Sequence, residues 1–182
     1  MALVDRVRNV LLTPKTEWPV IAGENPTAQS LYVGYILILA AIGPIAMALR
    51  GGIVGFSIGI VVASYAITLV MTYLGALIVD ALAPTFGGEK NFIRSLQLTA
   101  YSHTAAWVAG IFYLLPFVGR ILALLAAIYS IYTFYLGIPL LKKCPQEKAA
   151  AYAVVVLIAG IVLGVVLFNV LISLVVGGSA ME

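Results

Sequence analysis

His103 is the only histidine of the chain, and it lies well inside a stretch without charged residues. An imidazole in such surroundings could relay a proton or bind a cation. A metal site needs several ligands, and the sequence offers no second histidine and no carboxylate pair beside this one. We therefore favour a hydrogen-bonded structural histidine, and we expect no metal ion and no cofactor.

Five hydroxyl-bearing residues could extend a polar path from His103. They are Tyr101, Tyr129, Ser64, Thr68 and Thr72. The last three recur every four residues, so they share one face of a helix. Such hydroxyls bond to their own helix or to a neighbouring one, and we favour this packing role over a polar path. The hydroxyl of Tyr129 lies deep in its apolar stretch, and we expect it to have an internal partner.

Asp80 is the only acidic residue near the interior of an apolar stretch, and Arg94 begins the next stretch. We expect these two residues to form a structural ion pair, with a substrate-binding carboxylate as the alternative. The sequence has no His-Glu-x-x-His metal signature and no phosphate-binding glycine loop. Cys144 adjoins lysines but has no histidine near it in sequence, so we interpret it as an ordinary loop cysteine. We expect no catalytic residues and no enzyme activity.

The composition assigns the chain to a membrane. Of 182 residues, 63% are hydrophobic and 9% are charged, whereas soluble domains average about 25% charged residues. This number of charged residues is too small to cover a water-soluble surface. The apolar surface of the protein must therefore be solvated by the lipid bilayer. Nucleic-acid binding is disfavoured, because no basic stripe interleaves with aromatic residues. The single cysteine excludes an internal disulfide.

Apolar stretches of membrane length predict the fold. A span needs about 20 apolar residues to cross roughly 30 Å of hydrocarbon. The stretches cover residues 29–49, 53–81, 95–115, 120–141 and 149–174. We therefore predict an all-α membrane protein, with residues 25–178 forming a bundle of five transmembrane helices.

Residues 1–24 precede this bundle and have a different character. Apolar residues recur in residues 1–12 with helical period, and basic residues lie between them, as in interfacial helices. Thr13-Pro14 ends this stretch and can begin a second turn, and Trp18 favours the headgroup layer. We predict a cytoplasmic segment that contains an N-terminal amphipathic interfacial helix.

The distribution of lysine and arginine predicts the orientation. With five spans, eight of these residues fall on the side of the N-terminus, and only Arg50 and Arg120 fall on the other. We expect a multi-pass plasma (bacterial inner) membrane protein with its N-terminus in the cytoplasm and its C-terminus outside. The side chains expected to contact a cytoplasmic protein partner or anionic lipid are Arg6, Arg8, Trp18, Lys142, Lys143 and Lys148.

Small residues predict where helices pack closely. In membranes, helices associate where small residues let their backbones approach. One face of the second stretch carries such residues every four positions, and the fifth stretch carries a shorter pair. The six positions are Gly51, Gly55, Gly59, Ala63, Gly160 and Gly164. We expect them to form contact seams within the chain or between copies of a homo-oligomer.

Several stretches together resemble the prokaryotic branch of the Ypt-interacting-protein (Yip) family. They are Leu11–Trp18, Tyr101–Trp107 followed by Leu115–Gly119, and Ile128–Tyr132 followed by Tyr135–Pro139. The resemblance extends from about residue 8 to residue 172, and it lies in the order and spacing of the pieces. It implies five spans and a cytoplasmic N-terminus. Eukaryotic members are implicated in vesicle traffic and bind Rab-type GTPases, a role that does not transfer directly to a prokaryote, and the family has no established catalytic residues.

Two functional hypotheses follow. The first is a non-enzymatic Yip-type scaffold or adaptor that contacts partners or anionic lipid through its cytoplasmic face. The alternative is a small channel or transporter for an ion, a metal or a lipid, with a polar path near His103.

The topology is directly testable with reporters fused before Met1 and after Glu182. Five crossings place the two reporters on opposite sides of the membrane, because an odd number of spans separates the termini. Reporter activity in intact cells measures the side. Signals from both reporters on the same side would contradict the five-span topology.

Overall fold

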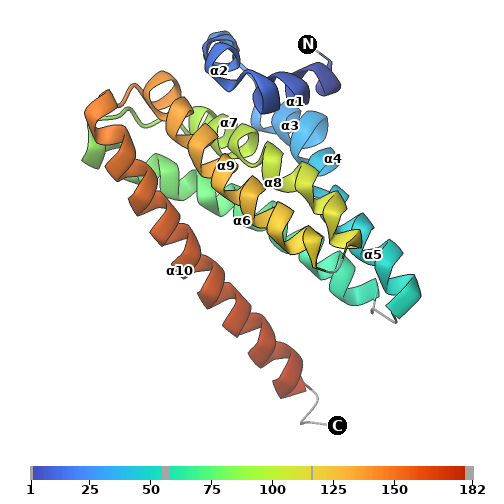
Figure 1. The fold of residues 1–182 in the computed structure, drawn as a ribbon. Coiled ribbons are helices and arrows are strands. Elements are labelled where there is room, and N and C mark those ends of the chain that lie inside the picture. Colours follow the sequence, from blue (N-terminus) through green and yellow to red (C-terminus); the bar gives the residue numbers. More distant parts are fainter. Residues whose placement is uncertain (1, 55–57, 116, 179–182) are drawn as a thin grey trace.

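A computed structural model provides the fold and describes residues 2–54, 58–115 and 117–178. The described residues form helices and turns, with no strand among them. The first half contains α1 (Leu3–Leu12), α2 (Pro14–Gly23), α3 (Ala28–Leu31), η1 (Tyr32–Ile36), α4 (Leu37–Ala40), α5 (Ile42–Val54), α6 (Ile58–Leu82) and η2 (Ala83–Phe86). The second half contains α7 (Phe92–Ser102), α8 (Thr104–Ala109), η3 (Gly110–Leu114), α9 (Val118–Lys142) and α10 (Gln146–Gly178). Figure 1 shows their arrangement.

Four of the predicted spans have the length and hydropathy of a membrane crossing. The candidate spans among the described residues are Ala28–Gly51, Ile58–Phe86, Val118–Lys142 and Gln146–Leu167. The first is continuous through α3, a π-helical turn at η1, α4 and α5. These apolar helices identify a multi-pass membrane protein whose outer surface contacts lipid.

The remaining predicted span, residues 95–115, has a different structure. It consists of α7, α8 and η3, and the helix is interrupted at His103. Every residue of Ser95–Ser102 is buried by other parts of the chain. Because this segment carries several polar side chains, it is better solvated by protein than by lipid. The count of five crossings stays a prediction.

The N-terminal hairpin, Leu3–Gly23, packs on the flank of the bundle (Figure 1). Pro14 occupies the first turn of α2, where a proline nitrogen needs no hydrogen-bond partner. The indole of Trp18 is buried, and it lies so close to Gly137 that a Cβ there would come within 2.9 Å of the ring. The predicted helices of residues 1–24 therefore form, with one face on protein, and their interfacial role stays a prediction.

Tyrosine hydroxyls join the first span to its neighbours. The hydroxyl of Tyr35 lies 2.6 Å from Oγ1 of Thr104 at the start of α8. Tyr65 of α6 donates to the carbonyl of Leu37, at 2.9 Å, just after the π-helical turn. Hydrogen bonds of this kind replace the water that backbone groups lack inside a membrane.

A close backbone contact between two helices lies away from the predicted small-residue seams. Gly110 of η3 meets Gly43 of α5 so closely that an added Cβ would lie 2.8 Å from the Gly43 Cα. In the predicted seams, Ala63 is exposed and Gly160 has no neighbour within 4 Å of a built Cβ. Gly51 is buried, and Gly164 makes only an ordinary contact with Met71, at 3.8 Å.

The prediction of a tight seam within the chain is therefore wrong at Ala63 and Gly160. At Gly160 the reason is that α10 diverges from the other helices (Figure 1), whereas Ala63 lies on an exposed face of α6. Gly55 lies outside the described residues. A seam between copies of the chain stays a prediction.

Replacing Gly110 by alanine tests the close contact. The new Cβ would press on backbone, which cannot rotate away, so the free energy of unfolding should fall by about 1–3 kcal/mol. Thermal unfolding of the detergent-solubilised protein measures the change. Gly160→Ala is the matched control and should leave stability unchanged or slightly higher, because its site is open and alanine favours helix. Equal unfolding temperatures for Gly110→Ala and the unaltered protein would contradict the contact.

Candidate functional site

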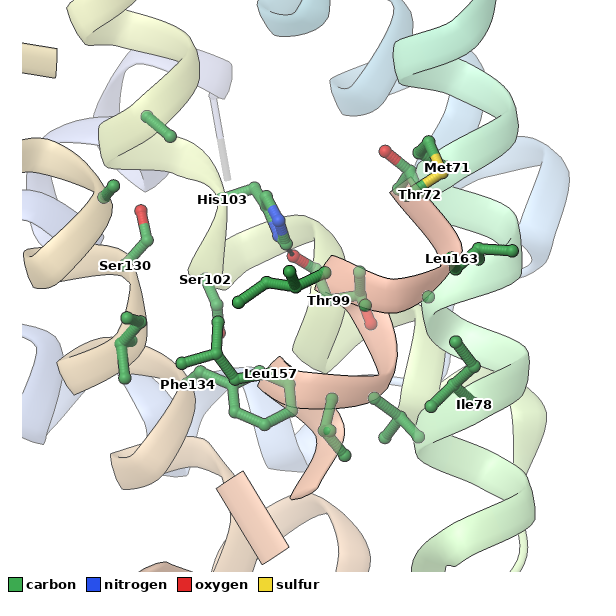
Figure 2. A pocket seen from close by; sticks show the side chains of 18 of the residues that line it. Met71, Thr72, Ile78, Thr99, Ser102, His103, Ser130, Phe134, Leu157 and Leu163 are labelled. Carbon is green, nitrogen blue, oxygen red and sulfur yellow. Dashed lines mark hydrogen bonds between the residues drawn. The ribbon is translucent and has the colours of Figure 1, made fainter. Parts of the chain in front are cut away.

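A cavity of about 460 Å³ lies within the membrane-spanning part of the bundle. Residues of α6, α7, α8, α9 and α10 line it, and Figure 2 shows it from close by. Most lining side chains are apolar, among them Met71, Ile78, Phe134 and Leu157. The polar lining residues are Thr68, Thr72, Thr99, Ser102, His103 and Ser130.

His103 provides the ring nitrogen that faces this cavity. It lies at the interruption between α7 and α8, and its side chain is exposed to the cavity. Nδ1 lies 2.7 Å from the carbonyl oxygen of Thr99. A carbonyl oxygen can only accept, so Nδ1 carries the hydrogen and the neutral ring keeps Nε2 as an acceptor. The interruption thus orients an acceptor toward an apolar space (Figure 2).

The structure brings together only part of the predicted polar path. Thr68 and Thr72 line the cavity with His103, but each hydroxyl donates to the carbonyl four residues earlier on its own helix. Ser64 donates to the carbonyl of Val61, at 2.8 Å, and is not among the lining residues.

The two predicted tyrosines have other roles. The Tyr101 ring packs edge-on against Tyr35, with a centroid separation of 4.7 Å, and the Arg6 guanidinium lies 5.4 Å from its centroid. Tyr129 donates to the carbonyl of Leu11, at 2.8 Å, which is the internal partner expected for it. Neither lines the cavity. Both instead hold the N-terminal hairpin to the bundle.

Sequence reasoning missed three polar residues of the cavity wall: Thr99, Ser102 and Ser130. Thr99 precedes His103 by four residues, and this spacing was the available signal. Ser130 lies on a different span, and no spacing rule links it to His103. Among the described residues, the Oγ atoms of Ser102 and Ser130 are buried without a hydrogen-bond partner. Native proteins rarely leave such groups unpaired, so this wall has unused hydrogen-bonding capacity.

The predicted ion pair between Asp80 and Arg94 is wrong. Nζ of Lys142 lies 2.9 Å from Oδ1 of Asp80, and the lysine side chain is 0% exposed. The same Nζ donates to the hydroxyl of Ser95, at 2.7 Å. Lys142 ends α9 beside the loop that follows α6, so it reaches this carboxylate.

Arg94 points the other way, toward the chain that follows the N-terminal hairpin. Its guanidinium donates to the carbonyl of Glu24, at 2.7 Å, and to the side chains of Asn25 and Gln97, both at 3.1 Å. Arg94 and Ser95 of α7 therefore attach this helix to different parts of the chain.

A second buried charge cluster holds the N-terminal hairpin. Arg6 is 5% exposed and forms ion pairs with both Glu17 and Glu24. Asn9 donates to the other oxygen of Glu17, at 3.0 Å. A buried charge is tolerated only when paired in this way.

These contacts correct part of the predicted cytoplasmic contact set. Arg6, Trp18 and Lys142 are buried within the chain, because each ties one segment to another, and they are not available to a partner. Arg8, Lys143 and Lys148 are exposed. Lys143 forms an exposed ion pair with Glu89, at 2.8 Å.

Cys144 lies in the loop between α9 and α10 and is 3% exposed. Its thiol donates to the carbonyl of Phe86, at 3.2 Å. Burial raises the pKa of this thiol, so the thiolate is disfavoured at neutral pH. The geometry indicates that Cys144 holds two loops together.

Residues 55–59 carry a Gly-x-Ser-x-Gly pattern. In hydrolases this pattern places the serine on a turn between a strand and a helix. Here the described residues before it form helix α5, Ile42–Val54. The chain before the pattern is thus helical, unlike the strand that precedes such a serine in hydrolases, and Ser57 itself lies outside the described residues.

A double-mutant cycle tests the corrected ion pair. Lys142→Met leaves Asp80 unpaired and should lower the free energy of unfolding by about 2–3 kcal/mol, less than in a fully buried pair because the aspartate side chain is 20% exposed. Unfolding in detergent should show strong coupling between Lys142→Met and Asp80→Asn. Coupling between Arg94→Met and Asp80→Asn should be close to zero. If instead Arg94→Met coupled more strongly to Asp80→Asn than Lys142→Met does, the ion pair between Asp80 and Arg94 would be supported.

The comparisons with known proteins agree with this architecture. The family model described as the Yip1 domain matches residues 8–168. No curated protein and no solved structure matches the sequence. The match includes the four candidate spans and the interrupted segment between the second and the third. The Yip resemblance is thereby confirmed, while the prokaryotic branch stays a prediction, and the chain belongs to the Yip1-domain family of membrane proteins.

Proposed function

We propose that this Yip-family membrane protein is a non-enzymatic scaffold that contacts anionic lipid headgroups, and through them cytoplasmic partners, by a basic surface. The observation that carries the proposal is a set of exposed basic side chains without an ion pair in the described part of the chain. Four of them lie on the side of the membrane that is predicted to be cytoplasmic: Arg8, Lys15, Lys90 and Lys148, referred to below as the free basic set. Arg120 is a fifth, on the predicted outer side.

This surface is basic because most acidic residues are used internally. Glu17, Glu24 and Asp80 neutralise buried cations, and Glu89 pairs with Lys143. The exposed acidic residues without an ion pair are only Asp5 and Glu147 in the part of the chain that the structure describes. Each basic residue near an anionic membrane surface contributes about 1 kcal/mol to lipid contact.

The proposal includes an orientation. Exposed charges on the N-terminal hairpin are costly in hydrocarbon, so its outer face belongs in the polar layer of the bilayer. Lysine and arginine concentrate on the cytoplasmic side of membrane proteins, which assigns the free basic set to that side. With five crossings the C-terminus lies outside, and the membrane is the plasma (bacterial inner) membrane.

The arrangement around His103 supports a non-enzymatic role. Its Nδ1 hydrogen bonds to a backbone carbonyl, and no carboxylate or nucleophile bonds to the ring among the described residues. A general base normally has such a neighbour to orient it.

The second candidate function is transport, favoured by the cavity beside His103. Of the three cargoes considered, an ion, a metal or a lipid, the apolar walls favour a lipid, because ions need continuous polar coordination.

Neutralising the free basic set tests the scaffold proposal. The variant with Arg8→Gln, Lys15→Gln, Lys90→Gln and Lys148→Gln should lose its preference for phosphatidylglycerol over phosphatidylcholine, by about fivefold for each charge at low salt. Competition between spin-labelled lipids at the protein in nanodiscs measures this preference. Raised salt should weaken the preference of the unaltered protein in the same direction.

Arg120→Gln is the matched control, because Arg120 is exposed at the start of α9, at the far end of that helix from Lys142. It should leave the preference unchanged. An unchanged preference in the fourfold variant would reject the basic surface as the lipid contact.

A further inference from the structure

The cavity beside His103 has no role in the lipid contact proposed for the basic surface. The cavity has the size of a ligand site. Its volume of about 460 Å³ falls in the usual range for small-molecule sites. Five helical elements contribute to it, and α10 forms one wall where it begins to diverge from the bundle (Figures 1 and 2). Gly160 on that wall leaves open space, since nothing lies within 4 Å of a built Cβ.

Water is a poor occupant of this cavity. A buried water molecule needs two to four polar partners, and an apolar cavity stays dry. Here the threonine hydroxyls are committed to carbonyls of their own helices. The acceptor at Nε2 of His103 and the unpartnered hydroxyls of Ser102 and Ser130 are the remaining polar groups. They lie among long apolar side chains, which favour a mainly apolar molecule.

The surroundings determine the chemistry of that molecule. The cavity lies within membrane-spanning helices, so lipid is the apolar material at hand. A charged headgroup is costly at this depth, whereas a small uncharged polar group is tolerated if it is hydrogen-bonded. Nε2 of the neutral ring accepts a hydrogen bond, so its partner must donate one. A hydroxyl group does so.

We propose that the cavity binds a single-chain lipid alcohol, whose hydroxyl donates to Nε2 of His103 and whose chain packs along Met71, Phe134 and Leu157. As in other small-molecule sites, the apolar walls provide affinity and a few polar groups orient the ligand. The inference names a ligand class for the second candidate function. Its test measures binding at equilibrium without flux, so failed transport and failed binding give different results.

The experiment uses the full chain in nanodiscs with hexadecanol that carries a photoreactive diazirine in mid-chain. Labelling should saturate and should map to peptides of α8, α9 and α10. Unlabelled hexadecanol should compete at least about twofold better than hexadecane, since one hydrogen bond contributes about 0.5–1.5 kcal/mol. Labelling that never saturates, or equal competition by the alcohol and the alkane, would overturn the proposal.

Substitutions at the polar group and at the wall sharpen the test. His103→Phe keeps the ring volume without the acceptor and should weaken binding about three- to tenfold. His103→Gln keeps an acceptor and should stay within about twofold of the unaltered protein. Gly160→Trp fills the cavity and should abolish saturable labelling, whereas Val162→Trp, at a residue of α10 that does not line the cavity, should not. Unchanged binding in both His103→Phe and Gly160→Trp would refute the site.

Two further measurements keep the outcome decisive. Ala127→Phe fills the cavity from α9 and replaces Gly160→Trp if that variant fails to unfold cooperatively. Leu157→Cys, in a Cys144→Ser background, reports whether a second copy of the chain occupies the cavity. Rapid disulfide formation between two copies would show that the cavity is part of a homo-oligomer interface and would overturn the lipid proposal. We expect no such disulfide.

Discussion

The structure depends on one constraint: inside a bilayer, polar groups find their partners within the protein or not at all. The interrupted segment of α7, α8 and η3 carries most of the buried hydroxyl and amide side chains, including Gln97 and Thr104. Its α7 part is therefore buried, packed against α6, α9 and the start of the first span, and the N-terminal hairpin contacts α8. The hydroxyl of Tyr35 and the ammonium of Lys142 reach this segment from two other helices. The apolar spans provide the surface toward lipid, and the polar segment determines how they pack.

The same constraint accounts for the use of charge. Arg6 and Lys142 lie where lipid cannot solvate them, and each takes acidic partners from elsewhere in the chain. Pairs of this kind are weak sources of net stability, but they are costly to break, so they fix which segments meet. Because they consume acidic residues, the surface near them is left basic. Internal pairing and the proposed contact with anionic lipid are thus two consequences of one distribution of charge.

The cavity lies where packing and hydrogen bonding are both incomplete. At His103 the helix is interrupted. The Nδ1–H of this ring donates to a backbone carbonyl, and Nε2 is left as an unused hydrogen-bond acceptor. On the opposite wall α10 diverges from the other helices (Figure 1). Gly160 on this helix leaves a gap that a larger residue would fill. The cavity is partly open rather than enclosed. Its position between a polar interruption and a diverging apolar helix is what suits it to an amphiphile.

By itself the sequence determined the membrane class, four of the spans, the helices of residues 1–24 and the family, because each follows from local composition, spacing or order along the chain. Tertiary structure alone decided the partner of Asp80, the burial of Arg6 and Trp18, and the contact of Gly43 with Gly110. It also decided which polar residues line the cavity, since Ser102 and Ser130 lie on different helices. The physical reason is that helical period predicts which residues share a face, but not which face of another helix lies opposite. That choice depends on how all the polar groups are satisfied at once.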